Sequence, residues 1–143
     1  MDVQKLLRNP RFRLERGPAP HPVQLKQFQE HAPPNLPRTY VRFLEACDSA
    51  RGKIPYDTGY IEFFAVESEL DQNRKHHVGE NLPGFFAFGS DGAGELYVFD
   101  LRSEDGAPVC CVSAKATGIA GVSRITNSFS EFLEGIVVMG GAT

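Results

Sequence analysis

Residues 84–113, which read GFFAFGSDGAGELYVFDLRSEDGAPVCCVS, decide the fold expected for this chain. Three short runs rich in aromatic and β-branched residues are separated by SDGAGE and RSEDGAP, a pattern typical of antiparallel strands joined by turns. Asp91-Gly92 and Asp105-Gly106 each supply a pair that tolerates the left-handed conformation where a chain reverses. The stretch therefore predicts a three-stranded antiparallel meander at the centre of the domain.

The middle run of this stretch is apolar on both sides. Successive side chains of a strand point to opposite faces, so Tyr97, Phe99 and Leu101 share one face. Leu96 and Val98 share the other face. Because an apolar face has to be buried, helices are expected to cover at least one side of the sheet. These features predict an α+β domain with a mainly antiparallel sheet.

The segment before the meander predicts a helix followed by a hairpin. Residues 35–52 carry apolar side chains at i, i+3, i+4 and i+7 from Tyr40, with Gly52 as the expected stop. Residues 54–66 then alternate as a strand pair, with Asp57-Thr58-Gly59 as its turn. Beyond the meander, residues 115–125 are interpreted as a Gly-containing connection.

Three further helices are predicted, over residues 22–32, 68–79 and 128–140. The first ends before a Pro-Pro pair, since a residue that precedes proline is disfavoured in the α region. The other two each begin with a capping box, in which Ser68 or Ser128 is followed three residues later by an acidic residue. The last of them is expected to form the closing helix of the domain.

Length and composition favour one domain. The chain has 143 residues, of which 41% are hydrophobic, enough for a core without metals or disulfides. We expect residues 1–22 to form an arm or short helix with a Pro-rich connector, and residues 23–143 to form a single domain. No run is long enough to span a membrane, and the first residues carry scattered charges, so a cytoplasmic protein without membrane contact is expected. Its three cysteines are expected to be reduced, with Cys110 and Cys111 on opposite strand faces.

Charge is distributed unevenly along the chain. Residues 1–17 hold five basic and two acidic residues, whereas residues 57–105 hold eleven acidic residues and three basic ones. Such an acidic segment should repel nucleic acid and could attract a basic protein. A solvated surface that keeps the domain soluble explains the same pattern. Both interpretations remain open from the charges alone.

Motifs for catalysis, cofactors and metals are absent from the sequence. The SDGAGE turn is too short to be an EF-hand loop, and no phosphate-binding glycine motif is present. His76 and His77 are adjacent and cannot share one helix face as a ligand pair would. We therefore expect a protein that is not an enzyme, has no catalytic residues and needs no cofactor or metal. A hydrolase would need titratable groups that converge in a cleft.

Four motifs follow one another in an order that resembles the SUKH superfamily. They are LP-x-x-Y-x-x-FL from Leu36 to Leu44, FG-x-DG-x-GE from Phe88 to Glu95, PV at Pro108-Val109, and SF-x-EFL from Ser128 to Leu133. The resemblance covers about residues 23–138. The chain departs from the family pattern at residues 48–52, where DSARG replaces a turn of the Asn-Gly-Gly type, and it contains no Trp.

The resemblance implies a curved, mainly antiparallel sheet packed by helices. For bacterial members of the superfamily it also implies an immunity protein that binds and neutralises a toxin, often a nuclease. The alternative, implied by the eukaryotic relatives that regulate cell-wall synthesis, is a regulatory or scaffold domain that docks a host protein or a small ligand. A convex acidic surface would favour the first role and a deep pocket the second.

A protein partner should meet an exposed acidic and aromatic face. The carboxylates of this face would attract a basic toxin domain. If the toxin is a nuclease, they would compete with nucleic-acid phosphates for its basic surface, and the tyrosine would anchor the contact. The residues expected to form this face are Asp57, Tyr60, Glu62, Asp91, Glu95 and Asp100. No direct contact with nucleic acid is expected.

Overall fold

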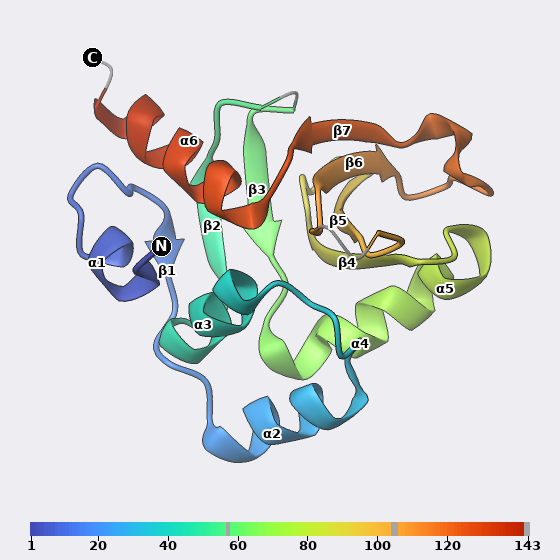
Figure 1. The fold of residues 1–143 in the computed structure, drawn as a ribbon, viewed down its shortest axis with the longest axis horizontal. Coiled ribbons are helices and arrows are strands. Elements are labelled where there is room, and N and C mark those ends of the chain that lie inside the picture. The colour runs from blue at the N-terminus through green and yellow to red at the C-terminus, as the bar shows by residue number, and fades with distance from the viewer. Residues whose placement is uncertain (57, 104–105, 142–143) are drawn as a thin grey trace.

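A computed structural model describes residues 1–56, 58–103 and 106–141. It contains one antiparallel sheet of seven strands, which lie side by side in chain order, and helices pack against this curved sheet (Figure 1). The strands are β1 Glu15–Arg16, β2 Ala50–Lys53, β3 Tyr60–Phe63, β4 Phe85–Ser90, β5 Glu95–Asp100, β6 Val109–Ser113 and β7 Ser123–Thr126. The helices are α1 Val3–Leu7, α2 Pro22–His31, α3 Arg38–Ala46, α4 Val66–Lys75, α5 Val78–Asn81 and α6 Phe129–Gly141, with a 3₁₀ turn, η1, at Ile119–Gly121.

The predicted meander and the predicted α+β class are confirmed. Strands β4, β5 and β6 pair antiparallel, with Tyr97 opposite Cys111 on one side and Gly89 on the other. The pairing of β4 with β5 shifts register between Ala87 and Gly89, and such a bulge increases the local twist of a strand. The adjacent cysteines also behave as predicted, because Cys111 joins one buried cluster and Cys110 another.

The inner face of the sheet carries the main core, which is rich in aromatic rings. Phe88 of β4 is fully buried there. Its ring centroid lies 5.6 Å from that of Tyr40 in α3 and 5.8 Å from that of Phe129 in α6. Aromatic pairs at such separations contribute about 0.5–1.5 kcal/mol each beyond the area they bury. Packing of these rings therefore fixes α3 and α6 on the same side of the sheet.

The outer face is covered over only part of its width. Val78 and Leu82, from α5 and the residue after it, join the second buried cluster with outward side chains of β4, β5 and β6. Partly buried residues of the β6–β7 connection, including Ala116 and Val122, pack on the same cluster. The outward side chains of β2, by contrast, are exposed. The sheet therefore has a covered half at β4–β6 and an open half at β1–β3.

Three strands, β1, β2 and β7, lie where the sequence predicted none, and β1 falls within the expected N-terminal arm. The helix predicted over 35–52 ends at Ala46, and Ala50–Lys53 form β2, so Gly52 is a strand residue and no helix stop. Ser49 reverses the chain between them with a φ of 76°. Strand β7, at the sheet edge, begins within the predicted connection 115–125 and ends one residue beyond it. All three strands are short and mostly polar, so their pairing with neighbours, and not their own composition, defines them.

The limits of α4 also differ from the prediction. It begins at Val66, two residues before the proposed capping box at Ser68. The Val66 N–H donates to Asp48 Oδ1 at 2.8 Å, so a residue distant in sequence caps this helix. The helix ends at Lys75 and not at Gly79, because His77 adopts a φ of 52° before α5 starts. Of the predicted hairpin turn at residues 57–59, Asp57 lies outside the described residues.

The capping box of the closing helix is confirmed. The Glu131 N–H donates to Ser128 Oγ at 3.1 Å, and the Asn127 N–H donates to Glu131 Oε2 at 3.1 Å. Within the three described ranges, no helix is long and apolar enough to cross a membrane.

The N-terminal arm is part of the main core. Val3 and Leu7 of α1, together with Phe12 and Leu14, are buried in the same cluster as the aromatic rings. Strand β1 then pairs with β2 at the sheet edge. Helix α6 contacts the arm where Gly140 meets the backbone of Arg11, leaving no room for a Cβ atom. The arm therefore depends on a glycine near the end of α6.

Replacing Gly140 by Ala should destabilise the protein by about 1–3 kcal/mol, because the new methyl group overlaps the Arg11 carbonyl. Urea unfolding measures this loss, and hydrogen exchange should show faster exchange at residues 12–16. Gly79→Ala is the matched control, since Gly79 is also helical and a Cβ there meets nothing within 4 Å. Equal stability of the two variants would contradict the docking of the arm.

Candidate functional site

The open half of the outer face presents polar side chains from three adjacent strands. Residues 50–53 and 60–63 alternate, so that Ala50 and Ile61 are buried on the inner side. The register places Arg51 opposite Glu62 and Lys53 opposite Tyr60, and Glu15 of β1 lies opposite Arg51. We define the open face as these outward side chains: Glu15, Arg51, Lys53, Tyr60 and Glu62.

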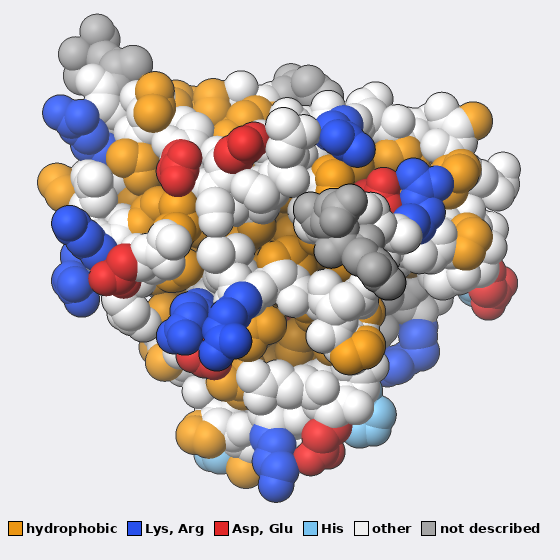
Figure 2. All heavy atoms as spheres, in the orientation of Figure 1, with side chains coloured by type: hydrophobic (Ala, Val, Ile, Leu, Met, Phe, Trp, Pro, Cys, Tyr) orange, Lys and Arg blue, Asp and Glu red, His pale blue; other side chains and the backbone are white. Residues whose placement is uncertain are grey.

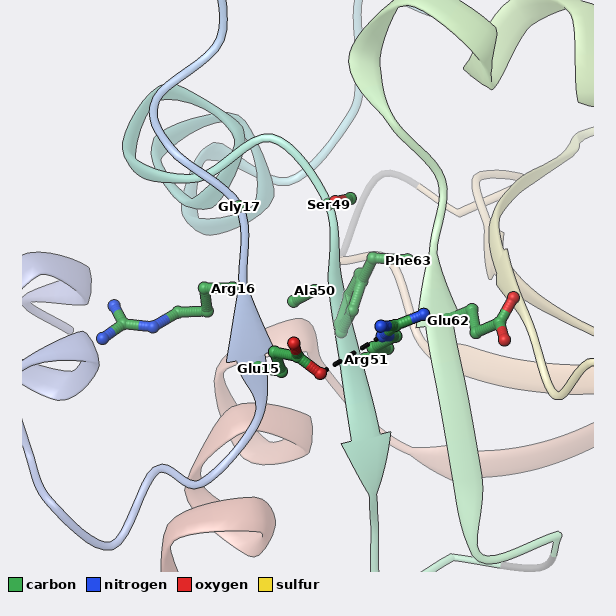
Figure 3. Close-up of a pocket in the computed structure, with 8 residues that line it drawn as sticks. All are labelled: Glu15, Arg16, Gly17, Ser49, Ala50, Arg51, Glu62 and Phe63. Carbon is green, nitrogen blue, oxygen red and sulfur yellow. Dashed lines mark hydrogen bonds and ion pairs between the residues drawn. The ribbon is translucent and has the colours of Figure 1, made fainter.

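An open hollow of about 360 Å³ lies on this face (Figure 3). Arg51 Nε donates to Glu15 Oε2 across it at 3.3 Å, with side-chain exposures of 61% and 75%. A pair this exposed contributes little to stability, but it orients both side chains along the strand edge. Glu62 turns its carboxylate away from Arg51 (Figure 3). A Cβ atom placed on Gly92 would lie 3.7 Å from Glu62 Oε1, so this carboxylate points towards the β4–β5 turn.

The β4–β5 turn borders the open face. Register places Glu62 beside Ser90, the last residue of β4. Asp91 Oδ1 accepts hydrogen bonds from the backbone N–H groups of Ala93 and Glu95, at 2.8 and 2.9 Å. An aspartate that bonds to the backbone two residues ahead stabilises the turn itself. Asp91 therefore shapes the turn, while the side chain of Glu95 is half-buried beside it.

The structure brings together three of the six residues proposed for partner binding, Tyr60, Glu62 and Asp91. Tyr60 and Glu62 lie on β3, and the Tyr60 hydroxyl is 3.4 Å from Glu62 Oε1. Asp91 lies in the adjoining turn, whereas Glu95 is on the same side of β5 as the inward-facing Tyr97 and therefore opposite the open face. Asp57 lies outside the described residues.

Asp100 is separate from this group, at the opposite end of β5 from Glu95. It is only 9% exposed, and it accepts hydrogen bonds from Arg102 Nε and Nη2, each at 3.0 Å. These hydrogen bonds hold the pKa of Asp100 below its ordinary value. Asp100 therefore forms a local ion pair with Arg102. The prediction that it is an exposed carboxylate on the binding face is wrong.

Sequence reasoning missed three members of the open face: Glu15, Arg51 and Lys53. The sequence places Glu15 in a basic arm, and it predicts a helix that includes Arg51 and ends just before Lys53. Alternation of small and charged residues over 50–53 was the available signal, but four residues are too few to distinguish a strand from a helix end. Their presence gives the face both signs of charge.

The acidic segment 57–105 does not form one surface. Glu69 is fully buried, and Asp71 forms an ion pair with Arg74. Glu67 and Glu80 lie on α4 and α5, away from β3. On the side of the molecule that Figure 2 shows, acidic side chains are scattered among basic ones. The count of charges along the chain therefore overstates the acidity of any single face.

Glu69 forms a buried pair with Tyr40 between α4 and α3. The Tyr40 hydroxyl donates a hydrogen bond to Glu69 Oε1, and both side chains are excluded from solvent. Glu69 Oε2 has no hydrogen-bond partner among the described residues. Burial raises the pKa of Glu69 and that of Tyr40 well above their ordinary values. Because solvent cannot reach it, this buried pair supports the fold and is not placed to act on a substrate.

The cysteine thiols are also poorly suited to chemistry. Burial raises the pKa of Cys47 to about 12 and that of Cys110 to about 11. A thiol must be deprotonated to act as a nucleophile, so both remain unreactive near neutral pH. Across residues 1–56, 58–103 and 106–141, no three His, Cys, Asp or Glu side chains come together as a metal site would require.

Stability should fall with rising pH because of Glu69. Its pKa in the folded state lies above the unfolded value of 4.5, so the folded protein binds more protons than the unfolded chain between those two pKa values. The free energy of unfolding should therefore decrease above pH 4.5, by up to about 1.4 kcal/mol per pH unit. Urea unfolding from pH 5 to 8 measures this slope.

Glu69→Gln removes the titrating group and should flatten the slope. Glu67→Gln, an exposed change on the same helix, should retain the slope of the unmodified protein. Parallel curves for Glu69→Gln and the unmodified protein would show that Glu69 is not the group responsible.

Comparison with known protein families supports the fold and the order of the motifs. Residues 19–135 match the SMI1 / KNR4 family (SUKH-1). No curated protein matches the chain. The family match includes α2 to β7 and the first turns of α6, so it contains both the meander and the open strands β2 and β3. The chain therefore belongs to the SMI1 / KNR4 family (SUKH-1).

Proposed function

We propose that this protein is a non-catalytic binding domain, and that its partner is a toxin domain which it neutralises as an immunity protein. The observation that carries the proposal is the open face, a solvent-exposed part of the sheet next to an acidic turn. Membership of the SUKH-1 family supports a role of this class. The closed Tyr40–Glu69 pair and the protonated thiols agree with a domain that binds without reacting.

The open face has the residue types that dominate protein interfaces. Tyrosine and arginine are enriched among residues whose loss greatly weakens binding. The open face presents Tyr60 beside Glu62 on β3, and Arg51 lies opposite Glu62 on β2. Tyr60 is half-buried by its neighbours, which limits the entropy lost when a partner covers the ring. Tyr60 is therefore proposed as the anchor of the contact.

The charges on this face indicate what the partner should present. Glu62, beside the β4–β5 turn, would face basic groups of the partner, while Arg51 and Lys53 on β2 would face its hydrogen-bond acceptors and carboxylates. A basic nuclease surface could supply the first set of contacts, and long-range attraction would speed its approach. The two basic residues make the face selective, because a uniformly basic surface would be repelled by them.

A second candidate is the regulatory domain that docks a host protein or a small ligand. It is favoured by a hollow of about 440 Å³ between the starts of α3 and α6, lined by Asn35, Leu101 and Arg102 among others. A volume of this size lies within the range of small-molecule sites. The two candidates use different parts of the molecule, so their ligands should respond to different substitutions.

The proposal can be tested by capture at two salt concentrations. Immobilised protein is incubated with lysate of the source cell at low salt and eluted at moderate salt, and the eluted proteins are identified by mass spectrometry. A basic polypeptide with nuclease activity that the purified domain inhibits would support the immunity role. A captured nuclease whose activity is unaffected by saturating domain would contradict it.

Substitutions on the open face should separate steering from anchoring. Glu62→Gln should slow association with the captured partner by about two- to threefold and reduce its salt dependence. Tyr60→Ala should instead speed dissociation and weaken binding by about 2 kcal/mol. Both effects are measurable by surface plasmon resonance at several salt concentrations.

Glu134→Gln is the matched control, because Glu134 is exposed on α6 and away from this face. Asp91 and Asp100 are left unchanged, since their carboxylates bond within the fold. Rates for the open-face variants equal to those of the control would remove this face from the proposal.

A further inference from the structure

A groove runs along α4 on a part of the molecule that the open face does not include. A hollow of about 660 Å³ lies between α2 and α4, and a second of about 570 Å³ lies between α4, α5 and β4. His31, Leu70 and Arg74 line both, so the two hollows adjoin each other. We call the two adjoining hollows together the α4 groove; α2 and α4 are seen side by side in Figure 1.

The floor of the α4 groove is apolar and held in place. Phe28 of α2 is 2% exposed, and its ring centroid lies 6.2 Å from that of Phe86 in β4. The Asn73 side chain donates to the Ala87 carbonyl at 2.9 Å and accepts from the Ala87 N–H at 2.8 Å, which ties α4 to β4. A ligand would therefore meet a preformed surface, and little ordering would oppose its binding.

The edges of the groove are acidic. Glu30, Glu67 and Glu80 contribute carboxylates from three different helices or their ends. None of the three is paired with a Lys or Arg among the described residues: Glu67 accepts from Gln24 at 2.8 Å, and Glu80 lies 3.6 Å from the His77 ring. All three are exposed, so each can meet an incoming cation without first giving up a Lys or Arg partner.

The basic residues nearby do not cancel this charge. Arg74 lines the groove, but its guanidinium forms an ion pair with Asp71. Asp71 lies one helical turn after Glu67, on the same edge of the groove. Lys26 and Lys75 belong to α2 and α4 and are exposed, yet neither lines the groove. The groove therefore combines a negative rim with an apolar floor.

We propose that the α4 groove binds a Lys- and Arg-rich extended segment of a protein partner. The aliphatic stems of these side chains would cover Leu70 and the floor, while their cationic ends reach the carboxylates at the rim. Helix α4 has ten residues, which corresponds to a length of about 15 Å. A segment of about five extended residues spans that length. This surface is separate from the open face, so the proposal stands or falls independently of the toxin-binding role.

The test uses the whole protein and a synthetic peptide, acetyl-Arg-Lys-Leu-Arg-Lys-Leu-amide, labelled with fluorescein for anisotropy. Titration followed by amide NMR should shift resonances of α2, α4 and α5 and leave those of β2 and β3 unchanged. The triple variant Glu30→Gln/Glu67→Gln/Glu80→Gln should raise the dissociation constant about tenfold, since exposed charge pairs of this kind add modest increments each.

A matched triple variant, Glu45→Gln/Glu131→Gln/Glu134→Gln, removes the same charge from exposed positions on α3 and α6. It should change the dissociation constant by less than about twofold, because distant exposed charges are largely screened at physiological salt. An equal loss of affinity in both triple variants, shifts confined to β2 and β3, or no binding at low salt would each overturn the proposal. Circular dichroism of all variants establishes that the fold is retained.

Discussion

Packing of aromatic rings on the inner side of β4 is the constraint on which the rest of this structure depends. The rings of Phe88, Tyr40 of α3 and Phe129 of α6 contact one another, and the ring centroids of Phe88 and Phe99 are only 4.3 Å apart. Because two helices and two strands meet at these rings, the inner side is closed to solvent. Binding surfaces are consequently left to the outer face and to the helices at the periphery.

The outer face of the sheet is covered only over β4 to β6, so strands β1 to β3 remain open there. Helix α5 and the β6–β7 connection bury the outward side chains of β4 to β6, and neither reaches β2. The N-terminal arm extends the uncovered region, because its residues 15–16 add a strand beside β2. The same arm is anchored in the aromatic core through Phe12 and Leu14. Core packing and the shape of the candidate binding surface are thus linked through one segment of chain.

The sequence predicted those elements that are specified by residues close together in the chain. The meander and the capping box at Ser128 are of this kind, as is the grouping of Tyr60 with Glu62. Strand β2 could not be predicted, because its residues become a strand only by pairing with β3. The start of α4 depends likewise on Asp48, which is distant in sequence. Charge counting failed for Glu69, since its burial follows from the packing of α3 against α4 and not from its neighbours in the chain.

The central claim is that the domain engages a protein through the open face. Hydrogen exchange of the domain, measured with and without its captured partner, tests this claim most directly. The account predicts slower exchange in residues 51–62 and 90–95, with unchanged exchange in α6. Protection confined to other parts of the sheet, or no protection in a complex that remains bound, would contradict it.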